Sequence, residues 1–281
     1  MNSLESENRL KFADLHTHTV FSDGTDTPER IVKVAKSCGL SAIAICDHDT
    51  VDGVLPVTKE AGASGVEIVP SLELSAEGNN IEVHILGFFI DYNNGYLIDK
   101  LAEIRQDRVV RMLEMVKKLN SLNIPIEADK VFEIAGAATV GRMHLARALH
   151  SQGYVSSFYE AFDKYIGENC PAYVSRFKLD PKGAIELILE AKGVPVLAHP
   201  HTLNNDDLIG DFSLFGLGGL EVYYPEYSPS AIEHYRAIAD KFGLIKTGGS
   251  DYHGSIKPQN PLGKVKVPYS TVEQLKDAKP S

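Results

Sequence analysis

Short apolar runs rich in β-branched residues recur along the chain and predict buried strands. The runs lie at residues 10–15, 42–46, 66–72, 81–90, 194–198, 219–222 and 244–246. Their near-continuous apolar character is typical of strands that are buried on both faces. Between the first two runs, residues 28–38 have a helical pattern in which Pro28 suits the first turn and Gly39 suits the C-terminal stop. Repetition of this strand-helix-strand order favours a largely parallel α/β barrel.

The interval from residue 94 to residue 173 interrupts this rhythm. A long helical pattern covers residues 96–122, and shorter ones follow at 128–135, 143–152 and 157–165. The barrel pattern resumes with a helix at 181–192 and the strand at 194–198. We therefore expect a barrel domain formed by residues 1–93 and 174–281, with residues 94–173 inserted as a helical subdomain.

Composition narrows the class of protein. The 281 residues are 43% hydrophobic and 23% charged, which is close to the average for soluble globular proteins and suits one barrel with an insertion. A net charge of −10 argues against an extended nucleic-acid surface, because such surfaces cluster Lys and Arg. It leaves room for a small anionic substrate.

Targeting and cysteine signals point to the cytoplasm. The first residues are polar, unlike a signal peptide, and no segment has the roughly 20 apolar residues that a membrane span requires. Cys38, Cys46 and Cys170 are odd in number and form no C-x-x-C pair, so neither a disulfide framework nor a thiolate zinc site is expected.

Histidines gather at the apolar runs. Of the ten histidines, six lie within or just after such a run: His16, His18, His48, His84, His199 and His253. The carboxyl ends of barrel strands converge on one rim, where active sites sit. His16 and His18 are separated by one residue, so they project from the same strand face and can share a metal ion. Asp23 follows in a turn where Gly24 permits close backbone approach.

Carboxylates join the histidines at the same positions. Asp47, His48 and Asp49 end the second run, Glu73 follows the third, and Asp251 precedes His253 by two residues. Each has an ordinary structural explanation: Asp47 and Asp49 can cap the next helix, and a lone Glu73 or His84 is usually structural. Because such explanations would have to hold independently at six strands, we favour a metal centre.

These strings closely resemble the PHP (polymerase and histidinol phosphatase) superfamily. The order is D-L-H-x-H-x(4)-D-G, D-H-D, L-E-L-S, H-x-L-G, A-H-P and G-S-D-x-H. The resemblance implies a distorted (β/α)7 barrel and three divalent metal ions, for which these N and O ligands suit Mn, Fe or Zn. It also implies hydrolysis of phosphate esters by a metal-bound hydroxide.

The resemblance implies a distribution of ligands. His16, His18, Glu73 and Asp251 would surround one ion, and Glu73 would bridge to a second ion held with His84 and His199. The third ion would be held by Asp23, His48 and His253. Many relatives have His where this chain has Asp23, so the third site can differ in affinity or metal preference.

The insertion carries a further motif, T-V-G-R-M-H-L-A at residues 139–146. Arg142 offers a planar fork suited to phosphate oxygens, and His144 lies near a predicted helix start. The motif resembles the PHP branch that acts on nucleoside monophosphates, 3′,5′-bisphosphates and short RNA 5′ ends, as a monoester hydrolase or a 5′-3′ exoribonuclease. Tyr173 and Lys178 are expected to border the same pocket, and His201 is a candidate general acid.

Three other interpretations remain open. Histidinol-phosphate phosphatase is the nearest, and the G-R-M-H string of the insertion is the feature that discriminates against it. An amidohydrolase typically needs a bridging carboxylated lysine, whereas this chain offers Glu73. A non-catalytic, metal-stabilised module is the third, although all nine ligand positions are filled.

Overall fold

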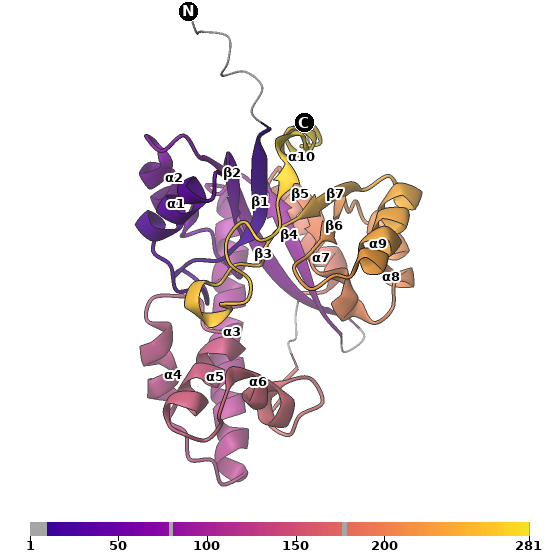
Figure 1. The fold of residues 1–281 in the computed structure, drawn as a ribbon. Coiled ribbons are helices and arrows are strands. Elements are labelled where there is room, and N and C mark those ends of the chain that lie inside the picture. The colour runs from indigo at the N-terminus through magenta and orange to yellow at the C-terminus, as the bar shows by residue number, and fades with distance from the viewer. Residues whose placement is uncertain (1–9, 79–80, 176–178, 281) are drawn as a thin grey trace, which may run out of the picture.

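The strands form one sheet that closes into a barrel. The computed structural model describes residues 10–78, 81–175 and 179–280, in which eight strands are ordered β7-β6-β5-β4-β3-β2-β1-β8. The strands are β1 (Phe12–Thr17), β2 (Ala42–Ile45), β3 (Glu67–Gly78), β4 (Ile81–Phe88), β5 (Val194–Leu197), β6 (Gly219–Tyr223), β7 (Ile245–Gly248) and β8 (Val267–Pro268). Tyr252, just after β7, pairs with Thr17 at the end of β1, while β8 pairs with the start of β1. The predicted α/β barrel with an inserted helical subdomain is confirmed (Figure 1).

One strand departs from the parallel pattern. β4 runs antiparallel to both neighbours, and it forms a long hairpin with β3 that extends from Ser71↔Phe88 to Gly78↔Ile81. All other adjacent pairs among β1 to β7 are parallel. Only residues 79 and 80 separate β3 from β4, which is far too short for the crossover that a parallel connection needs. This hairpin makes the barrel irregular.

Helices cover the outside of the barrel. They are α1 (Pro28–Ser37), α2 (Val54–Ala61), α7 (Pro181–Glu190), α8 (Asp207–Leu214), α9 (Pro229–Phe242) and α10 (Tyr269–Asp277). Three of them begin with the same device: the side chains of Thr27, Asp180 and Ser228 each accept a hydrogen bond from a backbone N–H of the first turn, and a proline follows. This combination fixes a helix start because the proline lacks the N–H that would otherwise be unsatisfied.

The insertion has a hydrophobic core of its own. It comprises α3 (Gly95–Ser121), α4 (Ala128–Ala135), α5 (Arg142–Ser151), α6 (Phe158–Ala161) and a π-helical turn at Phe162–Ile166. Met115, Val131 and Leu145 are fully buried in this core, whose buried members among the described residues all lie between Met112 and Ala172. Figure 1 shows α4, α5 and α6 gathered around the far part of α3, at the opposite end of the molecule from α10.

No helix in the described parts of the chain combines the length and apolar character needed to cross a bilayer.

Candidate metal centre

The nine residues singled out in the sequence converge on one rim of the barrel. His16 lies in β1 and His18 directly after it, His48 follows β2, His199 follows β5, and Asp251 and His253 follow β7. Glu73 and His84 do not end their strands: they face the rim from within the long β3–β4 hairpin. Pairing of Glu73 with His48 shows that the segment after β2 runs beside the middle of β3.

Glu73 is the centre of the cluster. Its side chain is 1% exposed, and its Oε2 lies 3.4 Å from His16 Nε2, 3.3 Å from His18 Nε2 and 3.2 Å from His48 Nδ1. The other oxygen, Oε1, lies 2.8 Å from His84 Nδ1 and 3.1 Å from His199 Nε2. A carboxylate between five imidazoles has the geometry to bridge metal ions.

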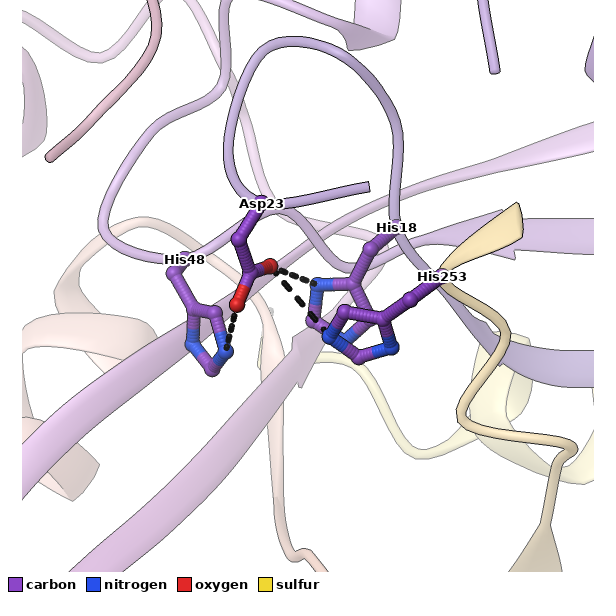
Figure 2. Close-up of side chains that lie close together, drawn as sticks. All are labelled: His18, Asp23, His48 and His253. Atoms are coloured by element: carbon purple, nitrogen blue, oxygen red, sulfur yellow. Dashed lines mark ion pairs between the residues drawn. The ribbon is translucent and has the colours of Figure 1, made fainter. Parts of the chain in front are cut away.

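Asp251 and Asp23 complete two further groups. Asp251 Oδ1 lies 3.7 Å from His16 Nε2 and 3.4 Å from His18 Nε2. Asp23 Oδ1 lies 3.2 Å from His253 Nε2 and 3.8 Å from His18 Nδ1, while its Oδ2 lies 3.8 Å from His48 Nε2 (Figure 2).

The donor atoms form three groups that share residues, as expected for ligands of neighbouring metal ions. Three groups of residues have donor atoms within 4.8 Å of one another. They are His16, His18 and Asp251; His18, Asp23, His48 and His253; and His48, Glu73 and His84. His18 and His48 thus each belong to two groups, so neighbouring ions would share a crowded set of donors.

The donor atoms fit divalent metal ions. Both ring nitrogens of His18 and Nδ1 of His48 and His199 are buried and have no hydrogen-bond partner among the described residues, although buried polar atoms are normally bonded. Metal ligation needs neutral imidazoles, and burial lowers the pKa of His18 to about 4 and that of His48 to about 3. At His84, burial lowers the pKa, but the charges and hydrogen bonds of Glu73 and Glu82 together outweigh burial and raise the pKa to about 9, so a cation there would displace a proton.

Two aspartates of the D-H-D motif, Asp47 and Asp49, hold neighbouring segments of the site in place by hydrogen bonds. Asp47 accepts hydrogen bonds from the backbone N–H and hydroxyl of Thr19 and from the hydroxyl of Ser22, and so holds the turn that presents Asp23. Asp49 accepts bonds from Ser75 N and Arg108 Nε. Neither aspartate caps α2, which begins after Gly53. In the Asp23 turn, a Cβ on Gly24 would lie 2.6 Å from the His18 carbonyl oxygen, so only glycine fits there.

Sequence reasoning missed two charged residues at the site. Glu221, in β6, is 0% exposed and lies 2.9 Å from His16 Nδ1 through its Oε1. Lys257 Nζ donates to Asp251 Oδ2 at 2.7 Å, and the Tyr224 hydroxyl donates to the same oxygen at 2.8 Å. A signal existed for Glu221, an acidic residue inside an apolar run, but none existed for Lys257 in an irregular loop.

The insertion forms one wall of the site. A cavity of about 170 Å³ is lined by cluster residues such as Glu73 and His84 and by Arg111, Arg142 and Phe162 of the insertion. Arg142 Nη2 donates to Glu82 Oε2 at 2.7 Å, and Glu82 Oε1 lies 3.0 Å from His84 Nε2. Tyr173 borders this wall, with its ring centre 5.7 Å from the Arg142 guanidinium. A larger cavity of about 890 Å³ between α3 and α7 contains none of the nine residues.

The other expected contacts lie elsewhere. His144 is 1% exposed and its Nδ1 accepts a hydrogen bond from Gly141 N at the start of α5, so it does not line the cavity. His201 is exposed, with its Nδ1 3.0 Å from the Tyr227 hydroxyl, and it is also outside the cavity lining. Lys178 falls outside the described residues.

Comparison with known proteins identifies the family. The PHP domain model matches residues 14–189. This chain belongs to the PHP family. Among solved structures, a protein from Bifidobacterium adolescentis that is predicted to be a metal-dependent phosphoesterase superposes on this PHP chain with a TM-score of 0.86 and 33% identity, over 94% of each chain.

Three curated relatives are similar over most of the PHP chain. A phosphoribosyl 1,2-cyclic phosphate 1,2-diphosphodiesterase from Eggerthella lenta is 30% identical over 86% of this chain and 94% of its own length. The 5′-3′ exoribonuclease Rnm of Escherichia coli is 32% identical, with coverage of 85% and 84%. A 3′,5′-nucleoside bisphosphate phosphatase from Chromobacterium violaceum is 30% identical, with coverage of 85% and 86%. All three names describe cleavage of phosphate esters.

Proposed function

We propose that this PHP protein is a metal-dependent phosphoesterase acting on 5′-phosphorylated nucleotides, 3′,5′-bisphosphates or the 5′ ends of short RNA. Two observations together carry the proposal: Glu73 and eight other residues with N or O donors form one cluster, and Arg142 of the insertion lines the same cavity. The names of the relatives support phosphate-ester cleavage.

The proposed cofactor is a set of three divalent ions, Mn, Fe or Zn, held by the nine residues. When bound, such ions activate water at neutral pH and stabilise the charge of an in-line displacement. The chain fixes the donors that would hold them. Lys257 and Tyr224 both bond the outer oxygen of Asp251, which leaves Oδ1 directed at His16 and His18.

The shape and charge of the cavity support the proposed substrate class. About 170 Å³ is below the usual range for drug-sized ligand pockets, which suits a terminal phosphate and its sugar. Arg142 and Arg111 provide guanidinium groups for a phosphate, and Phe162 and Tyr173 flank Arg142, with ring centres 5.5 and 5.7 Å from its guanidinium carbon. We infer that Arg142 binds a non-reacting phosphate and that His144 positions the loop that carries it.

We also propose a cytoplasmic location, because the three cysteines are free and thiols persist in a reducing compartment. His201, hydrogen-bonded to Tyr227, stays a candidate proton donor only if a substrate extends beyond the cavity.

The test is a product screen after chelation and addition of Mn²⁺. Substrates are a 3′,5′-bisphosphonucleoside, a 5′-monophosphate, a 5′-phosphorylated trinucleotide RNA, phosphoribosyl 1,2-cyclic phosphate and histidinol phosphate, with products separated by chromatography. The proposal expects Mn²⁺-dependent turnover that is highest with one of the nucleotide substrates. Preference for histidinol phosphate would overturn the substrate class, and no turnover of any phosphate ester would overturn the function.

A further inference from the structure

Glu221 occupies an unusual position for a charged residue. It lies in β6 with 0% exposure, and both of its oxygens are used. Oε1 lies 2.9 Å from His16 Nδ1, and Oε2 accepts a hydrogen bond of 2.7 Å from the backbone N–H of His199. A buried carboxylate is costly, yet this one contacts two of the nine donor residues, from two different strands.

The contact with His16 decides which ring nitrogen carries the proton. An ionised carboxylate only accepts hydrogen bonds, and the contact of Nδ1 with Glu221, at 2.9 Å, is shorter than that of Nε2 with Glu73, at 3.4 Å, so a neutral, metal-binding ring carries its proton on Nδ1. Nε2 then presents its lone pair toward Glu73 and Asp251, whose oxygens lie 3.4 and 3.7 Å away. Only this tautomer can donate Nε2 to a metal ion.

The contact with His199 acts on the backbone. His199 has φ 26° and ψ 62°, in the left-handed region that costs a non-glycine residue free energy. Pro200 follows, which further restricts the backbone of His199. The bond from His199 N to Glu221 ties this strained turn to β6 and thereby directs the ring toward Glu73 Oε1, 3.1 Å away.

We propose that Glu221 is a positioning residue that sets the tautomer of His16 and the backbone of His199 for metal binding. The proposal rests on the proposed metal site. It makes a specific statement about Glu221→Gln, which preserves the shape of the side chain. A glutamine has one acceptor oxygen and one donor NH₂. If the oxygen keeps the His199 N–H, the NH₂ faces His16 Nδ1, and this bond forms only when the ring proton moves to Nε2.

The experiment compares wild type, Glu221→Gln and Glu67→Gln. Glu67 is a matched control because it is a carboxylate on another barrel strand, β3, where it bonds to Tyr269 and lies six residues before Glu73. Each protein is chelated and titrated with Mn²⁺, and bound Mn is measured by elemental analysis. We expect Mn²⁺ affinity about 10- to 100-fold weaker in Glu221→Gln, with one ion fewer retained after gel filtration, and wild-type binding in Glu67→Gln.

A spectroscopic readout separates positioning from a general structural role. In protein loaded with diamagnetic Zn²⁺, whose binding requires neutral imidazoles, and labelled with ¹⁵N-histidine, the signals lost in His16→Asn identify His16. Its proton should reside on Nδ1 in wild type and on Nε2 in Glu221→Gln. An unchanged tautomer with unchanged Mn²⁺ affinity overturns the role of Glu221, as does a lower Tm with an unchanged tautomer. Absence of Mn²⁺ binding by wild type would instead overturn the metal site itself. If Glu221→Gln does not fold, the wild-type spectrum decides, because a proton on Nε2 of His16 overturns the proposal.

Discussion

Replacement of Arg142 by alanine tests how the insertion contributes to substrate selection. The change removes a guanidinium that lines the cavity, is 18% exposed and donates to Glu82 at 2.7 Å. None of the nine donor residues is altered. We therefore expect the metal centre to persist and the loss to depend on whether the substrate has a second phosphate.

The magnitude follows from the contacts that Arg142 already makes. A charge-assisted hydrogen bond contributes about 1.5–3 kcal/mol, equivalent to roughly a 10- to 150-fold change in kcat/KM. Glu82 already occupies Nη2, and Arg111, whose Nη2 is 3.9 Å from the same carboxylate, remains to attract a phosphate. We therefore expect the lower part of this range, about 10- to 40-fold, for a 3′,5′-bisphosphonucleoside.

Steady-state kinetics with three substrates measure this directly: a 3′,5′-bisphosphonucleoside, a 5′-monophosphate and a small aryl phosphate. Hydrolysis of the aryl phosphate should change less than about threefold, because it lacks a second phosphate. Arg236→Ala is the matched control, since Arg236 lies on the outer helix α9 and pairs only with nearby Glu233 among the ion pairs of the described residues. Equal losses on all three substrates would place Arg142 at the reacting phosphate, and no loss on any would refute its role.

Three further predictions concern the site and the fold. His16→Asn and Asp251→Asn should each abolish turnover while circular dichroism stays unchanged, because the apolar barrel core supplies most of the stability; turnover at the wild-type rate in either would refute the site. Met115→Ala removes a 0% exposed side chain from the core of the insertion and should lower the free energy of unfolding by about 2–5 kcal/mol, measured with urea; a loss below about 1 kcal/mol would contradict this core assignment. Chelation should remove activity that Mn²⁺ restores, and a chelated protein with full turnover would contradict metal dependence.

Local patterns in the sequence were sufficient to predict most elements of the fold. The expected helix at 96–122 is Gly95–Ser121, and the expected strand at 42–46 is Ala42–Ile45. The direction of β4 was not predicted, because an apolar run does not show whether a strand lies parallel or antiparallel to its neighbours. The spacing of two residues after Gly78 became apparent only once β3 was seen to extend to Gly78. The extension of β3 to Gly78 was not predicted for a different reason: residues 73–78 include polar side chains, so the strand was expected to end at residue 72.

The candidate site shows where sequence information ends. The motifs located the nine donor residues at or near predicted strands, and the barrel brings these parts of the strands together. Glu221 left a signal as an acidic residue inside an apolar run, but its role needed the three-dimensional contact with His16. Lys257 reaches Asp251 from a loop without periodicity. The position of His144 also depended on tertiary structure, since the same G-R-M-H string is compatible with a ring that faces the cavity or with one that caps α5.

The most direct test of the central claim is anomalous diffraction from crystals of the protein grown with excess Mn²⁺ at neutral pH. The proposed metal centre predicts three anomalous peaks per chain, each lying among donor atoms of the nine residues around Glu73. Crystals without an anomalous peak among these residues would contradict the claim that they form a metal centre.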